Sequence, residues 1–340
     1  MHRVTATAPT RIDLAGATLD IWPLHCLFEN VSTINFGIDL NAEVKITTND
    51  KKQFEISSLD QNFSVSGNFH ETINSNTYPL ASMLLANFWQ EELGGLTIET
   101  RAKSPAGAGL GGSSCLAIAL AGALTRLRNK LQPSFDLTER EIISGVSNTE
   151  ARLIRTPTGI QDYWGAMRGA LNILDFNPLG VNVTTIADQY VDYMNDHMVV
   201  VYCGKSRDSA MNNWEIFKGV FENNQQLQQV FQEITDCAKI CRQFALNGEW
   251  KNLLEHSHME WELRKKLWPG IETEETRKID RATQDAGAYF SRVCGAGGGG
   301  VMAVFCPSSS RQSVSEAAAS VGGTILDAKV SPKGLQVHFE

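Results

Sequence analysis

A glycine- and serine-rich stretch, residues 103–115, carries the clearest chemical signal in the sequence. It reads KSPAGAGLGGSSC and leads into residues 116–124, an uncharged segment typical of a buried helix. Glycines let the backbone approach a ligand closely. The first N–H groups of a helix lack partners within the helix, and the helix dipole adds partial positive charge there. The stretch therefore predicts an anion site whose natural ligand is phosphate.

The glycine pattern also fits other nucleotide-binding loops, but less well. G-x-G-x-x-G at residues 107–112 matches the dinucleotide motif, yet residues 103–105 separate it from any preceding strand. The same pattern recurs at 295–300 ahead of a strand, so it discriminates little. A P-loop needs G-x-x-x-x-G-K-[ST], of which residues 204–206 supply only the last three positions. A helix-capping loop without a ligand is the plainer alternative.

Charged residues on both sides of this stretch could act on a bound phosphate. Arg11, Asp13 and Asp20 lie among apolar neighbours in residues 8–23, which have the composition of a loop. An Arg–Asp pair with a purely structural role is the plainer interpretation of this segment. Asp162 ends a turn rich in Thr, Pro and Gly and stands at the start of the next helix. An aspartate can accept the proton of a hydroxyl group, and a nearby arginine would keep it ionised.

Two cations, Lys205 and Arg207, follow Gly204 at the start of the second half of the chain. Cations one residue apart in a loop can converge on one phosphate, arginine in bidentate fashion. Solvated surface charges beside Asp208 are the plainer alternative. If the loop does bind phosphate, the substrate already carries one.

A second group of potential ligands, His256, His258 and Glu260, lies in a predicted helix. Neither an H-E-x-x-H motif nor a cysteine cluster accompanies them. The sequence therefore predicts a solvated helix face here, with no metal site.

The composition of the 340-residue chain bounds its class and its partners. It is 42% hydrophobic and 20% charged, as is ordinary for globular proteins, and it is long enough for two domains. The net charge of −8 argues against nucleic-acid partners. Seven cysteines without a C-x-x-C pair indicate a reducing compartment. No apolar run approaches the roughly 18 residues of a membrane helix. We therefore expect a cytoplasmic protein with neither nucleic-acid nor membrane partners.

The elements that must position these residues divide into two halves. Residues 1–188 mix strands and helices and predict an α+β domain. Its strands are expected at 4–7, 34–48, 53–57, 96–101, 170–175 and 181–186, and its helices at 79–93, 116 to about 132, and 138–154. Residues 189–340 contain two strand–helix–strand returns, which are typical of a ferredoxin-like domain. Its strands are expected at 197–203, 300–305 and 334–339, and its helices at 213–246, 249–268, 274–287 and 310–320. A ligand cleft is expected between the halves.

Five features in this order resemble those of the GHMP kinases, a family named for galactokinase, homoserine kinase, mevalonate kinase and phosphomevalonate kinase. They are residues 8–20 (APTRIDLAGATLD), residues 105–114 (PAGAGLGGSS), Glu150, the turn 159–162 and the glycine run 295–300. The resemblance spans nearly the whole chain. It implies the α+β, two-domain GHMP kinase fold, with an ATP-binding domain at 1–188 and a ferredoxin-like domain at 189–340.

The resemblance implies an enzyme that uses ATP and Mg²⁺ to phosphorylate a hydroxyl group of a small molecule. By motif position, Asp162 would be the catalytic aspartate, and Arg11 would polarise the hydroxyl and steady Asp162. Ser113 and Glu150 would bind the metal, with Ser114 as the alternative serine. The nucleotide would be bound by Pro105, Gly107, Gly109, Leu110, Gly111, Gly112, Ser113 and Ser114. The substrate would be contacted by Arg11, Asp20, Asp162, Lys205, Arg207, Gly297 and Gly298. Replacing Gly109 is expected to block the nucleotide without unfolding the domain.

The choice of substrate depends on finer features of the same motifs. Arg11 stands where mevalonate kinases usually carry lysine, and Ala17 and Thr18 stand where galactokinases carry a Glu-His pair that contacts the hexose. The chain looks closer to the heptose and fucose 1-kinase branch, although Leu19 and Tyr163 depart from its pattern. The expected acceptor is the anomeric hydroxyl of a sugar or sugar phosphate, such as a heptose 7-phosphate or a fucose-like sugar. An isoprenoid-type kinase such as mevalonate kinase, a non-catalytic ligand-sensing homologue and a homodimer stay open as alternatives.

Overall fold

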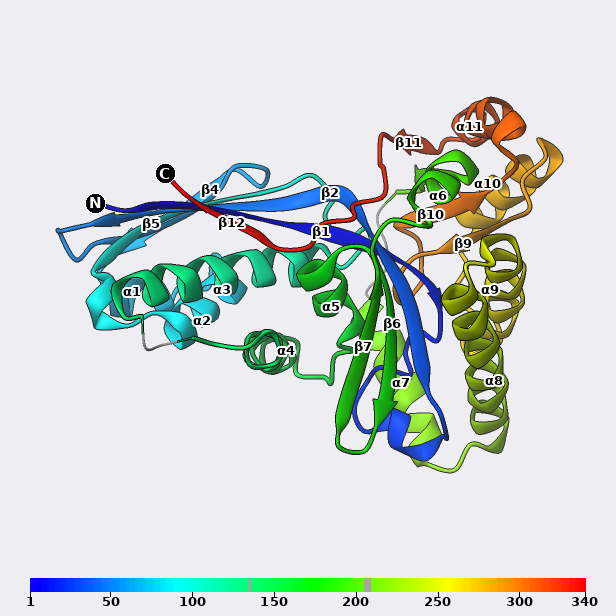
Figure 1. The fold of residues 1–340 in the computed structure, drawn as a ribbon, viewed down its shortest axis with the longest axis horizontal. Coiled ribbons are helices and arrows are strands. Elements are labelled where there is room, and N and C mark those ends of the chain that lie inside the picture. Colours follow the sequence, from blue (N-terminus) through cyan, green and yellow to red (C-terminus); the bar gives the residue numbers. More distant parts are fainter. Residues whose placement is uncertain (134–135, 205–208) are drawn as a thin grey trace.

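Two long antiparallel strands form the spine of the larger sheet in the computed structural model, which describes residues 1–133, 136–204 and 209–340 (Figure 1). β1 (Arg3–Ala15) pairs along β2 (Ser32–Asn49). β2 is long enough for two neighbours on its other edge, β5 (Gly95–Ala102) and β6 (Leu171–Asn177). The sheet is completed by β3 (Phe54–Ser58), β4 (Phe63–Gly67), β7 (Gly180–Ile186) and β12 (Gln336–Phe339).

β1 extends further than the sequence predicts. Residues 8–15, expected in a loop, continue the strand, and only the segment after Ala15 leaves the sheet. The strand was missed because Pro9 and the charged residues Arg11 and Asp13 are typical of a loop, whereas the structure buries these charges in a strand that is covered on both faces. Pro9 lies at a shift in register between Ala8 and Thr10, where a strand can accommodate proline.

The helices of the first half cover one face of this sheet (Figure 1). At their centre is α3 (Gly112–Leu131), which is almost entirely buried from Ser114 to Leu124, as predicted. The surrounding helices are α1 (Phe69–Ile73), α2 (Pro79–Phe88), α4 (Glu139–Ile154) and α5 (Gln161–Arg168), with 3₁₀ turns at Leu24–Leu27 and Glu91–Leu93. The predicted capping box of α4 is confirmed, because Thr138 and Glu141 each accept a hydrogen bond from the backbone N–H of the other.

The second half forms a four-stranded antiparallel sheet in the order β11-β8-β10-β9. Its strands are β8 (Met198–Tyr202), β9 (Phe290–Val293), β10 (Val301–Phe305) and β11 (Thr324–Leu326). Its helices are α6 (Val191–His197), α7 (Ser209–Phe221), α8 (Gln225–Asn247), α9 (Trp250–Arg264), α10 (Glu274–Asp285) and α11 (Arg311–Ser320), with a 3₁₀ turn at Ser308–Ser310. The strand–helix–strand, strand–helix–strand order confirms the ferredoxin-like arrangement.

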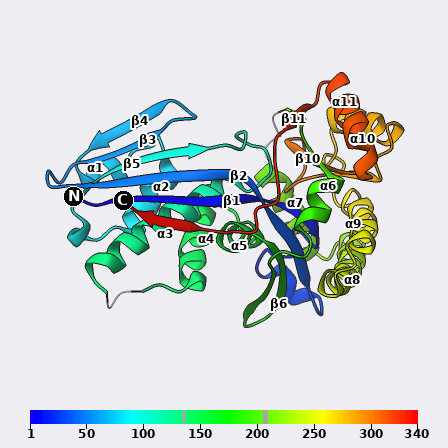
Figure 2. The same ribbon diagram turned by 45° about the horizontal axis from the view of Figure 1, so that its top comes forward.

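One predicted strand belongs to the other sheet. Residues 334–339 were expected beside β10, but β12 pairs with the start of β1, Val4 opposite Phe339 (Figure 2). The short strands β9 and β11, which the sequence did not reveal, take the remaining places in the second sheet. Pairing partners cannot be read from a four-residue strand, because alternation specifies a face and not a neighbour. The division at residues 188 and 189 stays a prediction.

The two halves share a hydrophobic core. Helices α8 and α9 pack on β1 and β2, and Ile12 and Leu14 of β1 lie in one buried cluster with Leu253 and Phe290. Within the described residues, no helix has the length and apolar character needed to cross a bilayer. The cavity described next lies where the first half meets the glycine run of the second.

Candidate active site

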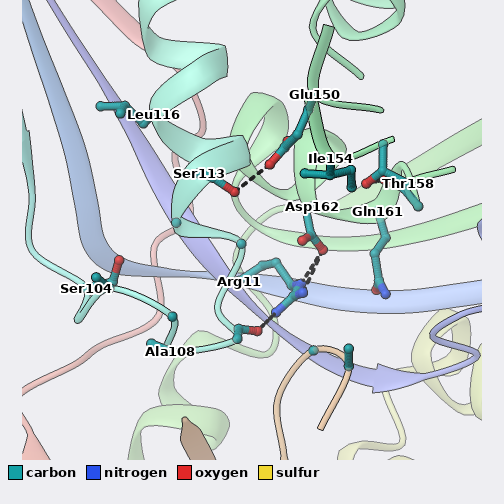
Figure 3. A pocket seen from close by; sticks show the side chains of 18 of the residues that line it. Arg11, Ser104, Ala108, Ser113, Leu116, Glu150, Ile154, Thr158, Gln161 and Asp162 are labelled. Atoms are coloured by element: carbon teal, nitrogen blue, oxygen red, sulfur yellow. Dashed lines mark hydrogen bonds and ion pairs between the residues drawn. The ribbon is translucent and has the colours of Figure 1, made fainter. Parts of the chain in front are cut away.

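A cavity of about 440 Å³ brings the sequence motifs together (Figure 3). Arg11 of β1, Ser113 of α3, Glu150 of α4 and Asp162 of α5 all line it. The loop between β5 and α3 forms one wall, and Gly295 of the second half contributes to another. Residues far apart in the sequence therefore face the same space.

The N-terminus of α3 opens toward this cavity. Its N-cap, Gly111, adopts a left-handed conformation with φ of 72°, and no described side chain caps the helix. Gly107 has φ of 70°, and a Cβ placed on it would meet nothing within 4 Å. The first N–H groups of the helix are thus available to a ligand, and the helix dipole favours an anion. This arrangement suits a phosphate group.

Gly109 has a structural role that the sequence did not reveal. A Cβ on Gly109 would lie 2.5 Å from the carbonyl oxygen of Cys294, and one on Gly295 would lie 2.5 Å from the carbonyl oxygen of Gly109. Both residues have positive φ angles, 75° and 73°. The two glycine loops therefore pack backbone against backbone, which only glycine permits.

Glu150 accepts three hydroxyl hydrogen bonds at the edge of the cavity. Ser113 Oγ lies 2.6 Å from Oε1, whereas Ser114 Oγ and the Tyr163 hydroxyl lie 3.2 Å and 2.6 Å from Oε2. Ser113 is exposed and lines the cavity, but Ser114 and Tyr163 are buried. Burial and the adjacent Glu150 carboxylate raise the pKa of the Tyr163 phenol well above its usual value. One carboxylate oxygen thus lies next to a cavity residue and the other contacts the protein interior.

Arg11 and Asp162 form a close ion pair. Arg11 Nε and Nη2 lie 2.8 Å and 2.7 Å from Asp162 Oδ1, and Nη1 donates to the carbonyl oxygen of Gly109 at 2.8 Å. Burial alone would lower the pKa of Arg11, but the carboxylates of Asp162 and Asp13 outweigh it and raise that pKa above its ordinary value. Arg11 therefore stays charged, and its ion pair fixes the orientation of the Asp162 carboxylate.

Behind Arg11, Asp13 lies at the centre of a buried cluster of charges. Its Oδ2 atom accepts hydrogen bonds from Arg264 and Arg292, both at 3.0 Å, and Oδ1 accepts from the backbone N–H of Gly295 at 3.0 Å. Arg11 Nη1 is 3.8 Å from Oδ1. Burial alone would raise the pKa of Asp13, but the three arginines outweigh it and lower that pKa to about 2. Asp13 therefore links the strand that carries Arg11 to the second half of the chain.

Glu260 belongs to the same cluster, which corrects the predicted solvated face of α9. Its side chain is fully buried, pairs with Arg292 at 3.1 Å and accepts the N–H of Gly16 at 3.0 Å. His256 and His258 do not join it in a metal site, and no group of three or more His, Cys, Asp or Glu in the described residues could hold a metal. The predicted solvated face is therefore wrong at Glu260, which the structure buries.

The end of the cavity beside Asp162 carries polar groups from the loop after β1 and from the first turn of α5. Asp20 is 2% exposed, and its Oδ2 atom accepts the backbone N–H of Gln161 at 2.9 Å. Burial raises the pKa of Asp20 to about 6. The Gln161 side chain is also buried, and its Oε1 atom has no partner among the described residues. Thr18, with φ of 78°, lines the same end.

Most of the residues predicted for the site line this cavity. They are Arg11, Asp20, Pro105, Gly107, Gly109, Gly111, Gly112, Ser113, Glu150 and Asp162. Leu110 and Ser114 are buried next to it, and Gly297 and Gly298 pack against Ile271, so that Gly295 and Ala296 face the cavity instead. Lys205 and Arg207 lie outside the described residues.

Three contributors were missed from the sequence: Arg264, Arg292 and the contact of Tyr163 with Glu150. Arg292 lies in β9, whose four residues FSRV are all buried, but a strand of this composition and length could not be predicted and so gave no signal of a buried ion pair. Arg264 precedes two lysines in a polar segment and gave no such signal. Tyr163 differed visibly from the pattern of its branch, but its partner could not be identified without the fold.

Comparison with protein families agrees with this geometry. The GHMP kinases N terminal domain matches residues 78–170, and the GHMP kinases C terminal domain matches residues 238–323. The chain belongs to the GHMP kinase family. Members of the family are phosphotransferases that use ATP as phosphate donor. The family and the α+β, two-domain fold predicted from the sequence are thereby confirmed.

The relatives of this GHMP kinase act on different substrates. It is 26% identical to the mevalonate kinase of Thermococcus onnurineus, with 99% of this chain and 98% of the relative covered. It is 22% identical to the D-glycero-alpha-D-manno-heptose 7-phosphate kinase of Campylobacter jejuni, with 99% of each covered. Its fold is similar to the crystal structure of the Methanococcus jannaschii mevalonate kinase, with a TM-score of 0.74, 17% identity, and 96% of this chain and 98% of that chain covered. These likenesses support kinase activity and leave sugar and isoprenoid acceptors as two alternatives.

Proposed function

We propose that this chain transfers the γ-phosphoryl group of ATP to the anomeric hydroxyl of a sugar or sugar phosphate, of the heptose 7-phosphate or fucose type. The arrangement of Arg11 and Asp162 beside the uncapped N-terminus of α3 supports phosphoryl transfer. The phosphate groups of ATP would lie along the loop 105–112 and the first N–H groups of α3. The acceptor would lie at the end formed by Asp20 and Gln161.

In this reaction the acceptor oxygen forms a bond to the γ-phosphorus while the bond from that phosphorus to the β–γ bridging oxygen breaks. Asp162 takes up the hydroxyl proton as ADP becomes the leaving group. Arg11 occupies Oδ1 of Asp162, so the proton would be accepted by Oδ2. Arg11 thereby holds the carboxylate in a fixed orientation.

Ser113 and Glu150 fit a magnesium ion by their chemistry. Mg²⁺ prefers oxygen ligands and is usually bound through one or two carboxylates together with substrate phosphates and water. A hydroxyl and a carboxylate oxygen 2.6 Å apart at the edge of the cavity provide such donors. When bound, the ion would neutralise charge on the phosphate oxygens. Ser113 is a better candidate than Ser114, because Ser114 is buried and does not line the cavity.

The residues at the end of the cavity beside Asp162 support a sugar as the phosphoryl acceptor. The carboxylate of mevalonate would need a cation, as would the phosphate of a sugar phosphate, and the only cations among the described cavity-lining residues are Arg11 and Arg264. Both are already paired, Arg11 with Asp162 and Arg264 with Asp13. At this end of the cavity the described residues therefore favour an uncharged sugar. Asp20 and the unpartnered Gln161 Oε1 are instead acceptors suited to the hydroxyl groups of a polyol. An isoprenoid acceptor is the second candidate, and the 26% identity to mevalonate kinase favours it.

A screen of ADP release with a coupled assay tests the proposal. The acceptors would be hexoses, deoxyhexoses, heptoses and their phosphates, with mevalonate and homoserine as comparison substrates. We expect turnover on a sugar or sugar phosphate, with phosphate on the anomeric oxygen by NMR. Turnover on mevalonate alone would replace the sugar proposal with the isoprenoid one. ATP binding without turnover on any acceptor would favour a ligand-sensing role.

A further inference from the structure

We propose that Tyr163 positions Glu150 for metal binding, so that the residue next to the catalytic aspartate serves the metal site. This inference rests on the proposed function, because it takes Glu150 as a magnesium ligand. It concerns a residue that touches neither the substrate nor the reacting atoms. Tyr163 is therefore a positioning residue.

Two adjacent residues of α5 face different surroundings. Asp162 lines the cavity and pairs with Arg11, whereas Tyr163 is fully buried with its hydroxyl 2.6 Å from Glu150 Oε2. Successive residues of a helix project about 100° apart, so one turn can supply a group to the cavity and another to the interior. The first turn of α5 thus connects the proposed proton acceptor to the proposed metal ligand.

The two oxygens of Glu150 have different environments. Oε2 accepts from Tyr163 at 2.6 Å and from the buried Ser114 at 3.2 Å. Among the described residues, Oε1 accepts a hydrogen bond from Ser113 alone, and Ser113 is the exposed serine of the cavity. Two donors on Oε2 fix the rotation of the carboxylate and leave Oε1 next to Ser113. If the Ser113 hydroxyl rotates so that its hydrogen no longer points at Oε1, Ser113 Oγ and Glu150 Oε1 become two adjacent oxygen ligands for one cation.

Removing a partner that orients a metal ligand usually weakens metal binding by roughly 10- to 100-fold. Tyr163→Phe removes the hydroxyl and keeps the buried ring. We therefore expect Mn²⁺, used as a paramagnetic substitute for Mg²⁺, to bind about tenfold or more weakly in the presence of ATP. The affinity for ATP in EDTA should not change, because loop and helix N–H groups bind the phosphates without this hydroxyl.

Tyr190→Phe is a matched control. Tyr190 is a second fully buried tyrosine, and its hydroxyl has no partner among the described residues. Its loss should leave Mn²⁺ affinity, measured by electron paramagnetic resonance, at the wild-type value. Glu150→Gln gives the effect of losing the charged ligand itself. In that background Tyr163→Phe should have no further effect on Mn²⁺ affinity, because both act on the same carboxylate.

Wild-type Mn²⁺ affinity in Tyr163→Phe, beside a loss in Glu150→Gln, would overturn the inference and leave the proposed function intact. Wild-type affinity in both variants would overturn the inference together with the proposed metal site. If Tyr163→Phe lowers the affinity for ATP in EDTA by the same factor as the affinity for Mn²⁺, the hydroxyl has a general structural role, and the inference is also overturned. If Tyr163→Phe does not fold, Ser114→Ala removes the other donor to Oε2, and an unchanged Mn²⁺ affinity there would count against positioning through that oxygen.

Discussion

The guanidinium of Arg11 contacts a single oxygen of Asp162, with Nε at 2.8 Å and Nη2 at 2.7 Å from Oδ1, although 151 residues separate the two. Arg11 is buried, whereas the Asp162 side chain is 25% exposed. The second carboxylate oxygen is therefore the one that can meet an acceptor hydroxyl. The ion pair thus orients Asp162 through Oδ1 and leaves Oδ2 without a contact to Arg11.

The first prediction concerns Asp162→Asn. An amide cannot accept the proton of the acceptor, so we expect turnover to fall by roughly two to four orders of magnitude. The dissociation constant for ATP should stay near the wild-type value, because the phosphates would be held by N–H groups of the loop and of α3, and a carboxylate donates no hydrogen bond to them. Steady-state kinetics with the authentic acceptor and calorimetry with ATP measure the two quantities. Near-wild-type turnover would remove Asp162 from the reaction.

The second prediction separates two glycines of one loop. A Cβ on Gly109 would meet the Cys294 carbonyl oxygen at 2.5 Å, whereas one on Gly107 would meet nothing within 4 Å. Gly109→Ala should therefore lower the free energy of unfolding strongly. Gly107→Ala should cost only the roughly 1–2 kcal/mol of its left-handed backbone and weaken ATP binding. Chemical denaturation and calorimetry distinguish the two variants, and equal stability would contradict the packing argument.

The contrast between these glycines shows where the sequence was insufficient. Both fit the nucleotide motif, and replacing Gly109 was expected to leave the domain folded. The loop of Cys294 and Gly295 lies against Gly109 in the structure, so the geometry argues against that expectation, which the stability measurement tests. The motif specifies which backbone must be free of side chains. It does not say whether a ligand or another loop needs the space.

The other residues of the site likewise divide into those that the sequence pointed to and those that it did not. Arg11, Ser113, Glu150 and Asp162 were predicted from their types and motif positions, and the structure brings them to one cavity, while their roles stay predictions. The partners of Asp13 could not be predicted, since Arg264 and Arg292 come from elements more than 240 positions away. In the fold, long periodic helices were predictable. The strand 8–15 was not, because it carries a proline and two charged residues that are buried in the fold.

The third prediction concerns Asp13→Asn. The substitution leaves the buried charges of Arg264 and Arg292 without their shared carboxylate. Breaking a buried ion pair by removing one partner typically costs about 3–5 kcal/mol of unfolding free energy. Glu139→Gln is the comparison, because Glu139 and Arg168 are 41% and 39% exposed, and such a pair contributes at most about 1 kcal/mol. If urea denaturation gives equal losses of unfolding free energy for Asp13→Asn and Glu139→Gln, the buried cluster around Asp13 contributes no more to stability than an exposed ion pair does.

The last prediction is a pH dependence that originates in Asp20. Burial raises its pKa from 3.8 to about 6, so the folded state binds this proton more tightly than the unfolded state does. Below about pH 4 both states are protonated, and above about pH 6 both are ionised. Between these values the folded state holds the extra proton, and its free energy of unfolding therefore falls as the pH rises. A shift of about two units corresponds to roughly 3 kcal/mol across the window.

Asp20→Asn isolates this contribution. Asparagine keeps an oxygen for the N–H of Gln161 but has no titrating proton. The stability of the wild type minus that of Asp20→Asn should therefore decline as the pH rises from 4 to 6 and be constant above that range. Taking the difference cancels other titrating groups, including Glu260, whose pKa is also raised by burial. Urea denaturation of both proteins at half-unit pH intervals measures the difference. Parallel stability curves would show that Asp20 titrates at its ordinary pKa, and a difference that grows with pH would show that its charged form is the one the fold stabilises.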